Sequence, residues 1–321
     1  MRDTDYAYAV ARVRSNECNL LTKQDIDSLM AAPDCDACLS RLAGKGWGGQ
    51  GRRFENESAM IDAQCERMWS LIGEIAPDLS VFDSLRIPND YHNLKAAIKA
   101  FVTGQEPDRF FITPYTVEPS VITEAIKERN YSLLPEHMQT AAQDAFRTLL
   151  EQRNGQLCDI IIDKASLEAS LENAKKYGGT LLELAKLSIL RSNIKIAWRC
   201  SLQKRSANFI AKALAEGCSP DTAQLTAASL EGKDAVIELL HSIDSGLEKA
   251  LSEEGVEGFD KACDNKRTQL LTKAKYTPLG VDPLIAYMIA CENEIRNVRL
   301  IFTGKRNCIP DERIRTMLRE V

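Results

Sequence analysis

The fold is decided by a short pattern that occurs three times, as Asn93-Leu94-Lys95, Asn193-Ile194-Lys195 and Asn297-Val298-Arg299. The copies begin 100 and 104 residues apart, about a third of the 321-residue chain. A large apolar residue recurs four positions after the first one in every copy, which places both on one face of an α-helix. These pairs are Leu94 and Ile98, Ile194 and Trp198, and Val298 and Phe302. The pattern therefore predicts one such helix in each third of the chain.

A basic edge accompanies each apolar face. The basic residue of the pattern lies about 100° around the helix from that face, and two of the three copies repeat the charge one turn later. In the third copy Thr303 takes the later position. We hypothesise that these edges surround a common axis and face an acidic partner or acids of adjoining helices. The residues concerned are Lys95, Lys99, Lys195, Arg199 and Arg299.

The alternative is that these cations pair with the chain's own 46 acidic residues and have no external partner. Both versions remain open at the level of sequence. The three asparagines themselves are interpreted as residues that form hydrogen bonds in helix packing, because buried amides need such partners.

Flanking residues favour a true internal repeat over a chance match. An acid precedes the asparagine by three residues in two copies, and an apolar–acid pair lies upstream in all three. A fourth, looser match at Asn173 fails because Gly178 occupies its second apolar position. We therefore predict three helical repeats within one compact unit, at 1–110, 111–208 and 209–321. The flanking residues are Asp90, Glu294, Phe54-Glu55, Ile162-Asp163 and Phe259-Asp260.

Helical periodicity extends over most of the chain. Apolar residues recur at spacings of three and four over residues 55–76 and 284–302, as in amphipathic helices of a bundle. The apolar run at 160–162 follows an Asn-Gly turn and precedes a helical pattern, so we interpret it as a helix start. Alternating strand patterns are almost absent, and the fold class is predicted to be all-α. Glycine and proline mark the joints at 104–107, 114–119, 217–220 and 278–283.

Composition excludes several classes of protein. The net charge is −5 and the pI about 5.5, so the chain has no overall basic footprint for nucleic acid. The longest apolar run, about nine residues at 283–291, is far shorter than the roughly 18 residues that cross a bilayer. Acids at the N-terminus do not fit a secretory signal, and ten scattered cysteines do not suggest a disulfide framework. We expect a cytosolic protein that does not span a membrane.

Motifs of catalysis are not found. The loop at 44–51 is predicted to be the most flexible. Its glycine spacing matches that of dinucleotide-binding loops, but such a loop needs a strand before it, and here a helical segment precedes it. Gly44-Lys45 also lacks the upstream glycine and the following serine or threonine of a phosphate-binding loop. Cys35 and Cys38 form a lone Cys-x-x-Cys pair without the second pair or histidines of a zinc site. We expect no catalytic residue, cofactor, metal or small-molecule substrate. His92, His137 and His241 are widely separated and are not predicted to be catalytic.

Three segments together resemble a known family. They are Tyr6–Arg14 followed by Leu20-Leu21, the Asp90-x-x-Asn93-Leu94-Lys95 helix, and Glu294-x-x-Asn297-Val298-Arg299 with Gly304-Lys305. In this order and spacing they resemble the C subunit of archaeal and bacterial V-type (A-type) ATPases, which is similar to the d subunit of the eukaryotic vacuolar enzyme. The resemblance covers nearly the whole chain. It departs at Leu190, where the second copy lacks the acid, and at loop 44–51, which looks like a local elaboration.

The resemblance implies a non-catalytic rotor part. Members of the family are helical, with three similar bundles arranged in pseudo-threefold symmetry as a funnel or truncated cone. One copy per complex sits between the membrane rotor ring of proteolipids and the central shaft, without a cofactor. It couples rotation of the shaft to proton or sodium transport and is attached peripherally to the membrane through the complex.

Two other classes of function compete with this interpretation. A general helical scaffold or adaptor would show ordinary helical-repeat stacking without a closed threefold arrangement. An all-helical enzyme would need a deep pocket with converging carboxylates or a metal, and carboxylates do not cluster in the sequence.

Overall fold

The computed structural model describes residues 2–319, in which every regular element is a helix and no strand occurs. The all-α prediction is confirmed for this part of the chain. Two compact units are formed, one by residues 1–79 with 253–321 and the other by residues 80–252, here called unit 1 and unit 2. The three repeats predicted from the sequence pattern have other bounds than these two units, and the division into three repeats stays a prediction.

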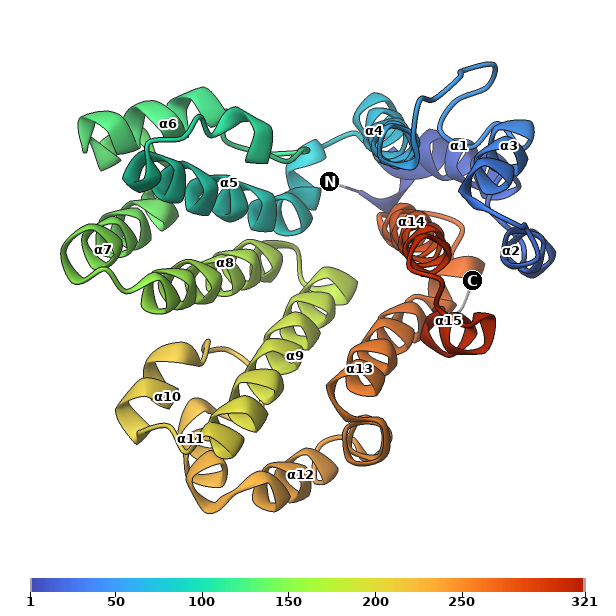
Figure 1. Cartoon of the computed structure of the whole chain (residues 1–321). Helices are drawn as coiled ribbons and strands as arrows, with labels where there is room; N and C mark the ends of the chain where they lie inside the picture. Colours follow the sequence, from blue (N-terminus) through green and yellow to red (C-terminus); the bar gives the residue numbers. More distant parts are fainter. Residues whose placement is uncertain (1, 320–321) are drawn as a thin grey trace. The chain divides into compact units, whose positions relative to one another are not determined.

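Unit 2 holds the first two repeat helices, α5 (Asp83–Thr103) and α9 (Gly179–Gln203) (Figure 1). Helix α8 packs against both of them, so it is shared by the two copies. The remaining elements of unit 2 are η3 (Asp108–Phe110), α6 (Pro119–Glu128), η4 (Tyr131–Leu133), α7 (Glu136–Gln152), α8 (Gly155–Tyr177), α10 (Ala207–Ala213), α11 (Thr222–Glu231) and α12 (Lys233–His241). The run at 160–162 lies inside α8, and its helical interpretation is confirmed.

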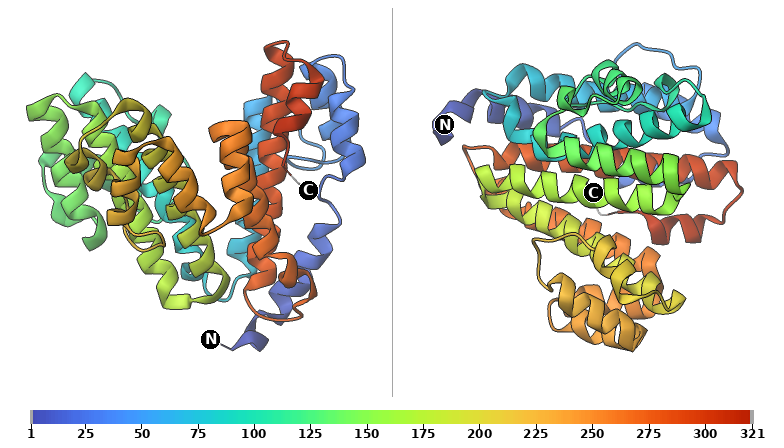
Figure 2. Two further views of the ribbon diagram at one scale, coloured as in Figure 1. Left: turned by 90° about the horizontal axis from the view of Figure 1, so that it is seen from below. Right: turned by 90° about the vertical axis from the view of Figure 1, so that its left-hand side faces the viewer.

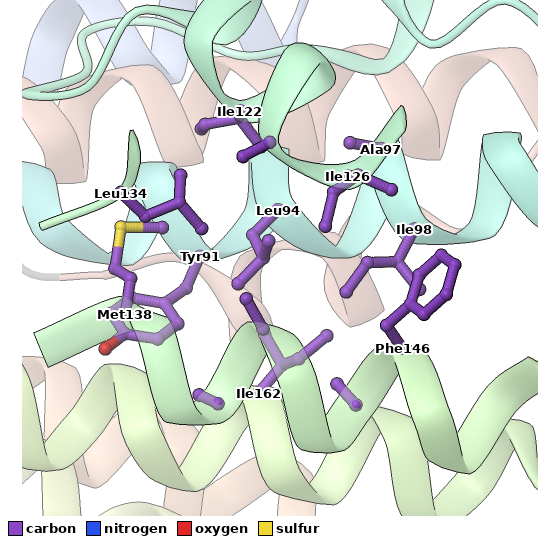
Figure 3. Close-up of a cluster of buried hydrophobic side chains, with 14 of the residues drawn as sticks. Tyr91, Leu94, Ala97, Ile98, Ile122, Ile126, Leu134, Met138, Phe146 and Ile162 are labelled. Atoms are coloured by element: carbon purple, nitrogen blue, oxygen red, sulfur yellow. The ribbon is translucent and has the colours of Figure 1, made fainter. Parts of the chain in front are cut away.

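The core of unit 2 includes a cluster centred on the apolar face of α5. Leu94 and Ile98 are fully buried there and pack with residues of α6, α7 and α8 (Figure 3). Burying a large aliphatic side chain stabilises a fold by roughly 1.5 to 3 kcal/mol. The face predicted from the four-residue spacing is therefore the face that holds α5 in its bundle.

Unit 1 is assembled from both terminal parts of the sequence. The third repeat helix, α14 (Asp282–Arg306), lies alongside α4 (Glu57–Ile75), and it also contacts helices near the N-terminus (Figure 2). Val298 and Phe302 are buried among apolar side chains of α2, α3 and α4. The other elements are η1 (Asp3–Tyr6), α1 (Ala7–Glu17), α2 (Lys23–Met30), α3 (Cys35–Gly44), η5 (Thr272–Tyr276) and α15 (Asp311–Met317).

Two helices include residues of both units, because the chain passes from one unit to the other within them. Helix η2 (Leu79–Phe82) starts with the last residue of the first segment of unit 1. Helix α13 (Ser245–Leu270) is interrupted at Gly255, whose φ of 70° is non-helical. A residue with φ in this range is most often glycine, because no Cβ clashes with the backbone.

Helix ends follow local sequence rules. Thr22, Asn56 and Asp221 each accept a hydrogen bond from the backbone three residues later, which satisfies a donor that the helix leaves open. Helix α5 ends at Gly104, whose φ of 68° is left-handed, as expected from the joint at 104–107.

Candidate partner-binding surface

The three repeat asparagines perform one structural task. Each side chain is fully buried and forms two hydrogen bonds with the backbone of one residue further along the chain. In unit 2, Asn193 Nδ2 donates to the carbonyl of Ala215 over 2.7 Å, and Oδ1 accepts from the Ala215 N–H over 2.9 Å. The prediction that these residues form packing hydrogen bonds is confirmed. We call this arrangement the asparagine clamp.

The other two clamps have the same geometry. Asn93 holds Ile112 with bonds of 3.0 and 2.8 Å, and Asn297 holds Arg319 with bonds of 3.0 and 2.8 Å. In each copy the clamped residue follows a short helix, η3, α10 or α15. The second and third clamps both span 22 residues, so α9–α10 and α14–α15 correspond at a constant offset of 104 residues. The three patterns in the sequence thus mark equivalent positions in structure.

The acids that precede two of the asparagines are also buried. Asp90 accepts hydrogen bonds from the backbone of Thr116 and Val117 and from the Thr116 hydroxyl. Glu294 accepts from the backbone N–H of Leu21, over 2.6 Å, and from the side chains of Trp47 and Gln64. Burial raises the pKa of both carboxyls, and the hydrogen bonds oppose that rise. Through these hydrogen bonds each acid attaches loop segments to the helix that carries it.

The predicted basic edge of the first copy pairs within unit 2. Lys95 lies 2.5 Å from Asp163, and Lys99 lies 2.6 Å from Asp159, both on α8. This matches the alternative in which cations of the edge meet the chain's own acids. The ion pairs are partly exposed, so each contributes at most about 1 kcal/mol to stability.

In the second copy the basic edge borders an open groove. Lys195 and Arg199 line a cavity of about 490 Å³ between α8, α9 and α10, together with Lys164 and Arg191. Sequence reasoning missed the last two. Arg191 could have been found, because it precedes Lys195 by the same four residues that separate Lys195 from Arg199.

Arg299 is exposed on α14 in unit 1. The structure thus brings Lys195 and Arg199 together in one groove and Lys95 and Lys99 into one set of ion pairs. Their roles toward a partner stay a prediction.

The residues considered for chemistry have packing roles. The Cys35 and Cys38 thiols donate to the backbone carbonyls of Phe302 and Leu29, and burial raises the pKa of Cys38. His137 packs against Tyr91, whose hydroxyl donates to the His137 carbonyl over 2.7 Å. Within residues 2–319 no three His, Cys, Asp or Glu side chains are grouped so that they could hold a metal ion.

The glycine-rich loop at 44–51 contains a buried tryptophan. Trp47 is 2% exposed, packs in the core of unit 1 and donates its indole N–H to Glu294. Gly48 N–H donates to the Gln64 side chain over 2.9 Å. Since Glu294 belongs to the third repeat, this loop is attached to the helix that carries the third asparagine.

Comparison with known proteins identifies the family of the chain. The family model described as ATP synthase (C/AC39) subunit matches residues 9–317. The C subunit of the V-type sodium ATPase of Enterococcus hirae is 24% identical, with 96% of each chain covered. The C subunits of the A-type ATP synthases of Methanocaldococcus jannaschii and Methanosphaera stadtmanae are 21% and 24% identical, with 98% of this chain and 86% and 87% of theirs covered.

No helix described for residues 2–319 is long and apolar enough to cross a membrane. The match extends across nearly the entire sequence and includes all three asparagine patterns. The chain therefore belongs to the ATP synthase (C/AC39) subunit family and is a V-type ATPase C subunit.

Proposed function

We propose that the chain is the central-stalk subunit that couples the rotating shaft to the membrane rotor ring of a V-type ATPase or ATP synthase. The observation that carries this proposal is the family match over residues 9–317. As a C subunit the chain is an accessory part of the complex and not the enzyme that hydrolyses or makes ATP.

The helical construction supports a mechanical role. Close-packed protein interiors have low compressibility and transmit strain, as a torque adapter requires. Each asparagine clamp adds a hydrogen-bonded crosslink between a long helix and the segment that follows its short helix. Three such crosslinks resist sliding of these segments under load.

The proposal includes the arrangement of the chain in the complex. Three bundles, from residues 1–110, 111–208 and 209–321, close around a pseudo-threefold axis as a funnel or truncated cone. One end meets the shaft and the other the proteolipid ring, in one copy per complex. The chain is then cytoplasmic and attached peripherally to the membrane, and the motor transports protons or sodium.

Basic residues are proposed to contribute to partner contact. Lys195 and Arg199 border the groove of unit 2, and Arg299 is exposed on unit 1. Lys95 and Lys99 contribute less, because Asp163 and Asp159 already neutralise them.

Removal of the chain from the complex tests the function. Membrane vesicles from cells that lack the chain should keep the proteolipid ring but lose ATP-driven ion transport, and re-addition of the purified chain should restore transport. A tagged chain should also isolate both the shaft and the ring from the wild type. Ion transport at the wild-type rate without the chain would refute the coupling role and favour the helical-adaptor alternative.

A further inference from the structure

The groove of unit 2 is lined by both apolar and basic side chains. The apolar side chains come from all three helices and include Ile160 and Leu167 of α8, Ile196 of α9 and Phe209 of α10. Four basic side chains line it, against a single acid, Asp163. Such a surface suits a ligand that has an apolar face and an acidic edge.

The spacing of the cations distinguishes a helix from a small anion. Arg191, Lys195 and Arg199 follow each other at four-residue intervals along α9, which corresponds to about 6 Å per step and about 12 Å in total. A phosphate-sized anion needs donors that converge on one point, and this row is too long for that. Acids at four-residue intervals on a second helix lie about the same distance apart.

An internal comparison shows that this groove is specialised. The corresponding helices of unit 1, α13, α14 and α15, form a cavity of about 510 Å³. Ile196 and Leu300 occupy matching places in the two grooves, each three residues after the clamp asparagine. Asp163 and Asp260 also match, each following a fully buried apolar residue.

At two further matching positions the grooves differ in chemistry. The lining residues Ile160 and Phe209 correspond to Glu257 and Arg313, which form an ion pair at 3.8 Å in the unit 1 groove. Four acids line that groove, against three basic residues. One copy of the repeat thus has an apolar and basic groove, and its counterpart has an ion pair and more acids than bases.

We propose that the groove between α8, α9 and α10 binds an acidic amphipathic helix of a partner chain, with its acids along the row Arg191, Lys195 and Arg199. Arg191 and Lys195 also interact within the chain, and the docked helix shares those cations. Because the equivalent groove has the opposite charge balance, the helix docks at one of the two sites and gives a pseudo-symmetric chain a single orientation toward its partner. That the partner is a rotor component rests on the proposed function.

A synthetic helix tests the groove directly on the full-length chain. The probe is a fluorescein-labelled, lactam-stapled peptide of four turns, with glutamates at four-residue intervals and leucines on the adjacent face. Its anisotropy should rise on titration with the chain, and a peptide of the same composition in scrambled order should bind at least about tenfold more weakly, a difference of about 1.4 kcal/mol.

Two variants locate the binding. Arg199→Glu changes an exposed residue and should weaken peptide binding about five- to tenfold, because it replaces an attraction by a repulsion. The control variant Lys212→Glu, at an exposed residue of α10 outside the groove lining, should change peptide binding less than about twofold. The double variant Ile160→Glu/Phe209→Arg installs the unit 1 ion pair and should abolish binding, with folding checked by circular dichroism. Equal effects of Arg199→Glu and Lys212→Glu, or equal binding of the scrambled peptide, would overturn the proposal. Displacement of the peptide by inorganic phosphate at matched ionic strength would overturn it in favour of an anion site.

A photo-crosslinking residue at position 199 separates this inference from the proposed function. In the purified complex it should form a crosslink to one other chain, through a helical segment rich in acids. A complex that contains the chain but gives no such crosslink would overturn the groove and leave the rotor role intact. Absence of the chain from the complex would reject the rotor role, and the peptide titration would still decide the groove.

Discussion

Replacement of Asn193 by leucine should destabilise unit 2 more than the same change at Asn93. Leucine has a similar size but cannot bind the N–H and carbonyl of Ala215, and Ala215 is only 1% exposed. An unsatisfied buried polar group costs about 1 to 3 kcal/mol, so two groups give a loss of about 2 to 6 kcal/mol. In the first clamp Ile112 is 37% exposed, so water can replace part of the hydrogen bonding that the Asn93 amide provides. We expect about 1 to 2 kcal/mol for Asn93→Leu.

Hydrogen exchange and urea unfolding measure this difference. Peptides that cover residues 207–220 should lose protection in Asn193→Leu, with the Ala215 amide affected most, and the midpoint of urea unfolding followed at 222 nm should fall. Asn307→Leu is the matched control, because Asn307 is exposed at the end of α14 and its side chain binds only the Thr303 carbonyl. Unchanged protection at Ala215, or a larger loss for Asn93→Leu than for Asn193→Leu, would refute the assigned role of the clamp.

Three more outcomes are expected. Gly304→Ala should lower the stability of unit 1 by about 1 to 3 kcal/mol, since a Cβ there would lie 2.6 Å from Ile314 Cγ1. Adding Ile314→Ala to the same chain should restore part of this loss in thermal melts, and additive losses from the two substitutions would contradict the contact. Burial raises the pKa of Glu294, so between the ordinary pKa and the raised one the folded state binds a proton that the unfolded state has lost, and stability falls as the pH rises through that range. Glu294→Gln should remove this fall in stability, measured by urea unfolding between pH 4 and 8, and the same dependence on pH in the variant and the wild type would contradict the assignment. Lys95→Met should lower the free energy of unfolding by no more than about 1 kcal/mol, and by less at high salt, because salt screens an exposed ion pair. A larger loss, measured by urea unfolding, would show that Lys95 and Asp163 do not form an ordinary surface ion pair.

The helical fold and the recurring asparagine pattern could be predicted because both leave a local signal in the sequence. Leu94, Ile194 and Val298 were identified by a four-residue spacing, and all three are fully buried. The role of the asparagines as packing residues also follows from their place beside that face. Their bonding partners, Ile112, Ala215 and Arg319, have no side chain in common, so no sequence pattern could identify them.

Long-range pairing explains what was missed in the candidate site. Lys95 and Lys99 look like the other basic residues of the edge, and their ion pairs depend on how α8 packs against α5. The loop at 44–51 looks flexible from its glycines, yet Trp47 within it is buried and bound to Glu294, 247 positions away in the sequence. The groove of unit 2 is lined by residues of three helices, so it could be recognised only after these helices had been placed.

The asparagine clamp has one consequence for how the copies could diverge. Its amide binds the clamped residue through the main-chain N–H and carbonyl, which all amino acids except proline present alike, so these two hydrogen bonds constrain the identity of that residue little. A buried alanine, a partly exposed isoleucine and an arginine that reaches Asp264 occupy this place in the three copies. Substitutions at the clamped position can therefore change the local chemistry while the two hydrogen bonds are kept, and the three segments can carry unlike surfaces on the same backbone arrangement.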